Sequence, residues 1–228
     1  APVYWLLGHA YGWLIAWALE VAAWPGGVLR MPSMSVAAYM LLVGGGLWLC
    51  LWQGRMRLWA GVPVALGVML AVTAQPPDLL VSADGHQVGI RIDDNGLARL
   101  RSRQASYAAT NWQTASAADT SIKLSHYSGA RCRRYNCVVR VGTGAGAALV
   151  LVTTGDELPP RQDFASACAD VDIVVSDLTL PPWCQPRRMR IDRATLARTH
   201  AMAIWLSKAR TATVAAQIGD HPWLPVRR

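Results

Sequence analysis

Two long apolar segments near the N-terminus constrain the fold of this chain more than any other feature. The residues from Ser35 to Trp52 carry no charge, and a second apolar run extends from Leu58 to Ala74. Only a short segment containing Gly54–Arg57 separates them. A helix needs roughly 20 apolar residues to cross a bilayer, so we predict transmembrane helices over 35–52 and 58–74. The second run is near the lower limit of length, and a buried or re-entrant helix is its alternative.

Residues 3–23 are also apolar, although they contain His9 and Glu20. We expect them to form an interfacial helix in the membrane plane, or a helix buried in a larger bundle. Residues 1–74 then form a membrane region, in which seven of the eleven Trp of the chain lie. The chain begins with neither Met nor the charged segment of a signal peptide, so we expect further membrane helices upstream of Ala1.

The charged residues predict an orientation for these helices. Arg55 and Arg57 lie between the two apolar runs, and the positive-inside tendency places this loop in the cytoplasm. Arg30, before the first run, counts against that orientation. Two crossings place residues 75–228 in the periplasm or outside the cell. We therefore predict a multi-pass membrane protein with its C-terminal domain on that side.

The C-terminal region carries most of the net charge of +8. A basic domain beside a membrane suits anionic lipid or nucleic acid, and a merely solubilising surface is the alternative. The arginines that lie in short clusters are the candidate phosphate contacts with DNA: Arg131, Arg133, Arg134, Arg187, Arg188 and Arg190.

Four of the five cysteines, Cys132, Cys137, Cys168 and Cys184, lie in the C-terminal region. Three disulfide connectivities are possible. Cys132 and Cys137 could instead form half of a thiolate metal site, but no second C-x-x-C or C-x-x-H pair completes a zinc set. We therefore favour disulfides, which agree with a periplasmic location. Cys50, in the first apolar run, is expected to be a small packing residue.

Residues 75–228 show the pattern of an α+β domain with a strand-rich core. The turn Asp94-Asn95-Gly96 and the glycine-rich segment 142–146 each connect two expected strands. The glycines resemble a phosphate loop only superficially, because no Lys-Ser/Thr follows them. Residues 106–128 are expected to form a weak helix and loop. Other expected elements are strands at 172–176, 189–192, 201–206 and 211–215, and helices at 163–170 and 193–199.

Residues typical of catalytic sites are sparse. No two of the five His lie within four residues of each other, so neither H-x-H-x-D-H nor H-E-x-x-H occurs. Ser176-Asp177 or Ser82 and Asp84 could join a His in a triad, but no nucleophile elbow supports this. Thr154-Gly155-Asp156 is the one site-like fragment, and a strand-terminating turn is its alternative.

Several segments together resemble a known family. These segments are Gly44–Trp59, Gln75–Arg91 (QPPDLLVSADGHQVGIR), Ala169–Leu178 (ADVDIVVSDL) and Gly219–Trp223 (GDHPW). In this order, along essentially the whole chain, they look like the C-terminal part of a bacterial competence DNA-uptake channel of the ComEC type, in the alphaproteobacterial style. The resemblance implies an inner-membrane protein for uptake of DNA, whose upstream channel helices would be its partners together with the lipid bilayer. In that family, the multi-helix competence domain resembles a channel that passes single-stranded DNA into the cytoplasm, and here most of that channel would lie upstream of Ala1.

Many members of that family add a metallo-β-lactamase-like domain that is suspected of degrading the other DNA strand. Ala148–Asp156 is similar to the segment that supplies a bridging metal aspartate, which makes Asp156 the one weak metal candidate here. Ala169–Ser176 is similar to a strand that normally leads into His-His-Gly-Ser, but Asp177-Leu178-Thr179 follows instead. One aspartate without histidines cannot hold two metal ions. We therefore expect a degenerate metallo-β-lactamase-like remnant without cofactor or hydrolase activity, which contacts DNA or a partner.

Two alternatives remain open at the level of sequence. One is an active membrane-anchored nuclease of the metallo-β-lactamase type, which requires bound zinc or manganese. The other is a structural membrane module with a disulfide-braced periplasmic domain and no role with nucleic acid.

Overall fold

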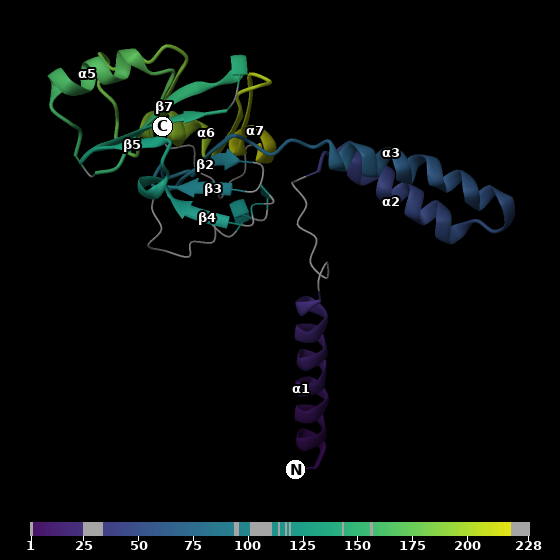
Figure 1. Cartoon of the computed structure of the whole chain (residues 1–228). Coiled ribbons are helices and arrows are strands. Elements are labelled where there is room, and N and C mark those ends of the chain that lie inside the picture. The colour runs from purple at the N-terminus through teal and green to yellow at the C-terminus, as the bar shows by residue number, and fades with distance from the viewer. Residues whose placement is uncertain are drawn as a thin grey trace.

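A computed structural model describes residues 2–24, 34–93, 96–100, 111–113, 115–116, 118, 120–142, 144–155 and 157–219. An N-terminal helical region is followed by a strand-rich α+β domain, as the sequence predicts (Figure 1). The domain contains two mixed sheets. The closing segment around Asp220–Trp223 lies outside the described residues.

The first helix, α1 (Pro2–Ala23), stands apart from the other elements (Figure 1). All its residues are exposed, including the large side chains, so it is not buried within this chain. Its apolar side chains lie on every side of the helix, a pattern typical of a helix surrounded by apolar material. By length and composition, α1 can cross a membrane.

The next elements form a helical hairpin: α2 (Val36–Leu51), the 3₁₀-helix η1 (Gly54–Ala60) and α3 (Gly61–Val72). Ser35 caps α2 by accepting a hydrogen bond from the backbone N–H of Ala38 at 3.2 Å. The continuous segment Gly54–Val72 is also long and apolar enough to cross a membrane. With 16 residues, α2 is shorter, and at 1.5 Å per residue it reaches about 24 Å.

The first sheet of the C-terminal domain has the strand order β11-β10-β1-β2-β3-β4. All neighbouring strands are antiparallel except β3 and β4, which are parallel. Its strands are β1 (Leu79–Val81), β2 (Val88–Asp93), β3 (Gly96–Arg99), β4 (Thr120–Lys123), β10 (Met202–Trp205) and β11 (Arg210–Thr213).

The second sheet has the order β5-β6-β7-β8-β9. Its β5–β6 and β6–β7 pairs are antiparallel, whereas β7, β8 and β9 run parallel. Its strands are β5 (Ala130–Cys132), β6 (Asn136–Val141), β7 (Ala148–Thr153), β8 (Ile173–Val175) and β9 (Met189–Ile191). The short 3₁₀-helices η2 (Leu124–His126) and η3 (Gly144–Gly146) precede β5 and β7.

The main core lies between the two sheets. Val81 and Ile90 from the first sheet share one buried cluster with Val150 and Val175 from the second. A smaller cluster lies where α5 (Arg161–Asp170) packs on the second sheet, with Phe164 at its centre. The remaining helices are α6 (Arg193–Thr199), which follows β9, and α7 (Val214–Ile218).

The segment directly after α3 contacts the domain through hydrogen bonds and an ion pair. The indole N–H of Trp205 donates to the carbonyl of Gln75 at 2.8 Å. Asp78 is buried, pairs with Arg91 at 2.6 Å, and accepts from the backbone N–H of Leu206 at 2.8 Å. The domain is therefore attached directly at the end of the hairpin.

Most expected strands and helices occur close to their expected positions, with two differences. Residues 120–123 form the strand β4 inside the region expected to be helix and loop, because they pair in register with β3. The strand expected at 211–215 ends at Thr213. The Thr213 side chain accepts from the backbone N–H of Ala216 at 3.3 Å and so starts α7.

Candidate functional site

Polar side chains gather where the parallel strands of the second sheet end. Thr153 is the last residue of β7, Ser176-Asp177 follow β8, and Asp192 follows β9. All four side chains are buried. The Thr153 hydroxyl donates to the Ser176 Oγ at 2.9 Å, and the backbone N–H of Leu178 donates to the same oxygen at 3.1 Å. Carboxyl ends of parallel strands are common positions for ligand sites, so this cluster is the candidate site.

A loop of the other sheet reaches this cluster. His86, between β1 and β2, places its Nδ1 2.8 Å from the Oδ2 of Asp177. Asp177 is 3% exposed and His86 is 44% exposed. Gly85 has a φ of +74°, and a Cβ there would meet the Cα of Asp177 at 2.9 Å. Glycine is therefore required at this position, both for the backbone conformation and for the close approach.

The β1–β2 loop is held by its own polar groups. The Ser82 hydroxyl and the backbone N–H of His86 both donate to Asp84, and the backbone N–H of Gln87 donates to Ser82. Burial alone raises the pKa of Asp84. The hydrogen bonds from Ser82 and His86, with the charge of His86, outweigh this effect and hold that pKa below its ordinary value.

Asp192 has a structural role in the same cluster. It accepts from the guanidinium of Arg190 at 2.6 Å and caps α6 by accepting from the backbone N–H of Thr195 at 2.9 Å. Burial alone raises the pKa of Asp192, but the hydrogen bonds from Arg190 and Thr195 lower it below its ordinary value. The Asp192 carboxylate therefore binds the N-terminus of α6 and the guanidinium of Arg190.

The chemistry available to this cluster is that of an oriented imidazole. A carboxylate bound to one ring nitrogen of a His fixes the tautomer and orientation, as in many general bases. The two buried hydroxyls, on Thr153 and Ser176, are bonded to each other. Among the described residues, no group of three or more His, Cys, Asp or Glu side chains is placed to hold a metal ion. Asp156, the metal candidate from the sequence, lies outside the described residues.

Sequence reasoning did not pair His86 with Asp177. The two residues are 91 positions apart, and they come from different sheets. The available signal was local: an Asp-Gly pair such as Asp84-Gly85 is typical of a turn, and Ser176-Asp177 follow a buried strand. Neither pattern specifies which turn meets which strand end.

The six candidate phosphate-contact arginines divide into two groups. Arg131 lies on β5, and Arg133 and Arg134 lie in the β5–β6 loop, all exposed. Arg187, Arg188 and Arg190 lie in or before β9. Because β5 and β9 are opposite edges of the five-stranded sheet, the structure does not bring the two groups together.

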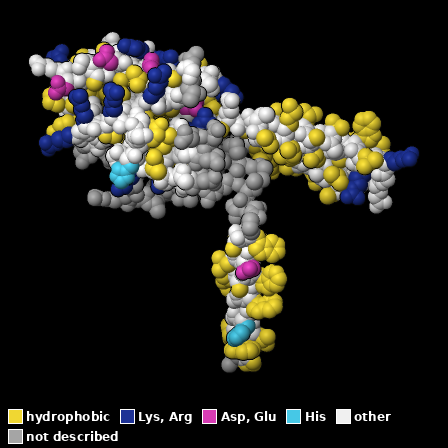
Figure 2. Space-filling view, viewed as in Figure 1, with side chains coloured by type: hydrophobic (Ala, Val, Ile, Leu, Met, Phe, Trp, Pro, Cys, Tyr) yellow, Lys and Arg dark blue, Asp and Glu magenta, His cyan; other side chains and the backbone are white. Residues whose placement is uncertain are grey.

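The β9 group is partly occupied by intramolecular contacts. Arg190 binds Asp192 and also donates to the carbonyl of Leu180 at 2.8 Å. Arg188 lies 3.4 Å from Asp172. Figure 2 shows many Lys and Arg side chains on the visible face of the domain, whereas hydrophobic side chains dominate the helices. The β5 group is therefore the more available anion-contact surface of the two.

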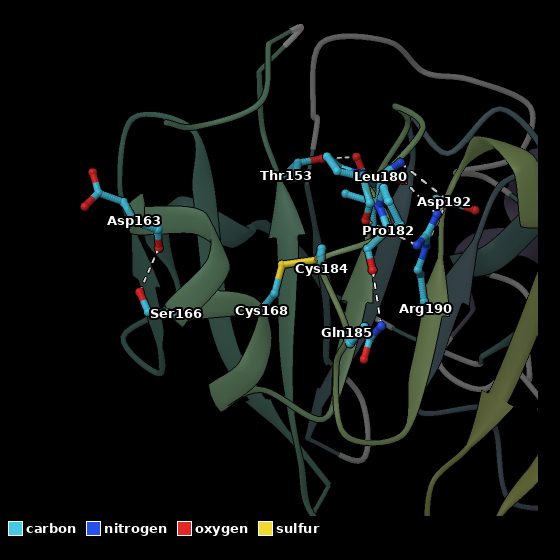
Figure 3. The surroundings of a disulfide bond; sticks show 12 residues. Thr153, Asp163, Ser166, Cys168, Leu180, Pro182, Cys184, Gln185, Arg190 and Asp192 are labelled. Atoms are coloured by element: carbon cyan, nitrogen blue, oxygen red, sulfur yellow. Dashed lines mark hydrogen bonds and ion pairs between the residues drawn. A yellow bond between two sulfur atoms is a disulfide. The ribbon is translucent and has the colours of Figure 1, made fainter. Parts of the chain in front are cut away.

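The four C-terminal cysteines form two disulfides, as the sequence favoured. Cys132 bonds to Cys137 across the β5–β6 pair, and Cys168 of α5 bonds to Cys184 in the loop before β9 (Figure 3). Neither pair is a thiolate metal site. Cys50 is free and exposed on α2, so the expectation that it packs inside the chain is wrong. The interface of α2 with α3 uses other residues.

No family model matches the chain, and no curated protein or solved structure is significantly similar to it.

Proposed function

We propose that this chain is the C-terminal, membrane-anchoring part of an inner-membrane competence protein of the ComEC type, for uptake of DNA. Its α2–η1–α3 hairpin crosses the membrane, and its α+β domain lies in the periplasm. The domain is a degenerate metallo-β-lactamase-like remnant that contacts DNA and does not hydrolyse it. The segments Gly44–Trp59 and Gln75–Arg91, which resemble family segments and occur in the same order along the chain, support the family assignment.

The packing of the hairpin is the observation that carries the membrane part of the proposal. The residues buried between the helices are small: Ala38, Gly45, Ala60, Gly67 and Ala71. Large apolar side chains lie outside, among them Leu51, Met69 and Val72, which are 66–71% exposed. A Cβ on Gly45 would meet the Val64 side chain at 2.6 Å. Small residues at the interface and large ones outside are typical of helices packed in lipid.

The two ends of the hairpin support its orientation. Arg55 and Arg57 lie in η1, at the end opposite to the domain. Near them, Trp48 and Trp52 stack with ring centroids 4.9 Å apart, and the Trp48 indole donates to the Met56 carbonyl. Tryptophan is enriched at membrane interfaces, and arginine is enriched in cytoplasmic loops. The domain on the other side contains both disulfides, as expected for an oxidising compartment.

The two facing mixed sheets support the metallo-β-lactamase-like assignment of the domain. In metallo-β-lactamase-like hydrolases, metal ligands follow the strands to which the segments 148–156 and 169–176 are similar in sequence. Here the residues after β8 are Ser176 and Asp177, which bind Thr153 and His86. The β8 strand end is thus filled by hydrogen bonds within the protein.

The DNA part of the proposal is tested with the full chain in detergent micelles. We expect a fluorescent single-stranded oligonucleotide to bind with an affinity that falls as salt rises, because phosphate contacts release counterions. Replacing Arg131, Arg133 and Arg134 together by Gln should weaken binding and reduce the salt slope by about 2–3. Replacing Arg187 and Arg188 by Gln is the matched control, with a smaller expected effect. Absence of binding even at low salt would exclude DNA contact.

A hydrolase is the second candidate, and the His86–Asp177 geometry is the observation that favours it. It predicts nuclease activity that requires added Zn²⁺ or Mn²⁺ and is lost in Asp156→Ala and His86→Ala. Our proposal predicts no cleavage of either DNA strand with or without these metals. Metal-dependent cleavage that both variants abolish would replace our proposal by the hydrolase.

A further inference from the structure

The two disulfides of the domain differ in their access to solvent. Cys168 and Cys184 are both 0% exposed and are packed with Phe164 under α5. Cys132 is exposed and Cys137 is 2% exposed. An attacking thiolate must reach a sulfur atom directly, so solvent access favours exchange at Cys132–Cys137 over exchange at Cys168–Cys184.

The Cys132–Cys137 bond is also the less necessary of the two for the fold. It joins residues that are already paired across β5 and β6, and it closes a loop with a sequence separation of 5, against 16 for Cys168–Cys184. The backbone N–H of Arg133 donates to the Asn136 carbonyl at 2.7 Å, and that of Thr154 donates to the Tyr135 carbonyl at 2.9 Å. Shorter loops lose less chain entropy on cross-linking, and these backbone bonds hold the hairpin without sulfur.

The charge around Cys132 favours thiolate chemistry. Arg131, Arg133 and Arg134 are exposed, and no acidic residue occurs from Ala130 to Asn136. Neighbouring cationic groups stabilise a thiolate and make it a better leaving group in exchange. The sulfurs of Cys168 and Cys184 are instead surrounded by apolar side chains.

We propose that Cys132–Cys137 is a site of thiol–disulfide exchange with a dithiol oxidoreductase. The thiolate of the oxidoreductase attacks the Cys132 sulfur, a mixed disulfide forms, and Cys137 leaves as a thiolate that takes up a proton. The second thiol of the oxidoreductase then attacks its own sulfur in the mixed disulfide and releases Cys132 as a thiol. The domain gains two electrons and two protons, and the oxidoreductase becomes a disulfide. The Cys168–Cys184 bond remains oxidised.

This site goes beyond the proposed function, because its reactivity does not depend on DNA. The bond closes the loop that carries Arg133 and Arg134, so exchange alters the surface that we propose as a DNA contact. A failure of DNA binding would leave the exchange reaction unaffected, and the two proposals therefore fail separately.

The test uses the full chain in detergent, with Cys50→Ala to remove the free thiol. The probe is a thioredoxin-class dithiol protein whose resolving cysteine is replaced by Ser, which traps the mixed disulfide. With this variant we expect one covalent adduct, mapped to Cys132 by peptide mass spectrometry. With the intact probe we expect Cys132–Cys137 to be reduced at least about tenfold faster than Cys168–Cys184. The circular dichroism spectrum should remain unchanged.

Two variants sharpen this experiment. Replacing Arg131, Arg133 and Arg134 by Gln should slow reduction of Cys132–Cys137 by the intact probe several-fold while the bond still forms, because Cys132, the thiolate that leaves in the second step, loses its cationic neighbours. A Cys132→Ser, Cys137→Ser double variant should fold and form no adduct. An adduct at Cys168 or Cys184, equal reduction rates for both bonds, or no reaction without denaturant would overturn the proposal.

Discussion

The helical hairpin and the C-terminal domain use similar residue types in opposite ways. In the hairpin, the buried positions include Gly45 and Gly67, and the large apolar side chains are exposed. In the domain, Phe164, Leu151 and Ile173 are almost fully buried. Burial of large apolar groups stabilises a fold only where water is the alternative. The difference supports the proposal that the hairpin lies in lipid and the domain in water.

Truncation of a large apolar side chain should give the largest difference in stability loss between the domain and the hairpin. Phe164→Ala removes a fully buried ring that packs edge-on against Trp183. We expect it to lower the free energy of unfolding of the domain by about 3–5 kcal/mol. Leu51→Ala removes a side chain that is 71% exposed, and it should change hairpin stability in detergent by less than about 0.5 kcal/mol. Denaturant titrations of both variants make the comparison, and equal costs would contradict it.

The ion pair between the buried Asp192 and the partly exposed Arg190 should give the next largest effect. Asp192→Ala removes the cap of α6 and leaves Arg190 without its carboxylate. We expect a loss of about 3 kcal/mol of unfolding free energy. Asp170→Ala is the matched control, because Asp170 is exposed at the end of α5. A cost for Asp192→Ala as small as that of the control would show that this cluster does not stabilise the domain.

Replacing a glycine by a larger residue should destabilise the helix pair only where that glycine lies at the interface between α2 and α3. A Cβ on Gly45 would meet Val64 at 2.6 Å, whereas nothing lies within 4 Å of a Cβ on Gly44. We expect Gly45→Leu to destabilise the helix pair by about 1–3 kcal/mol and Gly44→Leu to have little effect. Energy transfer between dyes at the two helix ends in micelles measures their association. The opposite ranking would mean that the helices pack by another face.

Acid should weaken the domain and leave the hairpin unchanged. The pKa values of Asp84 and Asp192 are lowered in the folded domain, so the unfolded chain binds protons first as the pH falls. Their contribution to stability is fully present above the ordinary value of 3.8 and is lost as the pH falls through the lower folded values. Residues 34–74 contain no acidic group. Unfolding curves recorded from pH 7 down to about pH 2 should therefore shift for the domain only, and mainly below the ordinary value of 3.8.

The turns and individual strands could be predicted from the sequence, because they depend on residues that are close together along the chain. Strands β2 and β3, which flank residues 94–95, pair antiparallel, and so do β6 and β7, which flank the glycine-rich segment 142–146. The buried run within 172–176 is the inner strand β8. In each case the turn residues and the apolar period specify the element, because both act over a few residues.

Features that depend on distant residues could not be predicted. Any of three connectivities fitted the four cysteines, and only the packing of α5 against the loop before β9 brings Cys168 to Cys184. The His86–Asp177 pair likewise requires the two sheets to be in place. The division of the six arginines between opposite edges follows from strand order. Strand order is a property of the whole sheet, and local patterns do not contain it.

The orientation of the hairpin is the central claim, and cysteine labelling in intact bacteria tests it most directly. In the Cys50→Ala background, a single cysteine is placed at Met56 in η1 or at Ser207 in the β10–β11 turn. A membrane-impermeant maleimide should label the Ser207 position in intact cells and the Met56 position only after the inner membrane is permeabilised. Labelling of Met56 from outside, or equal labelling of both positions before permeabilisation, would contradict a hairpin that crosses the membrane with its domain in the periplasm.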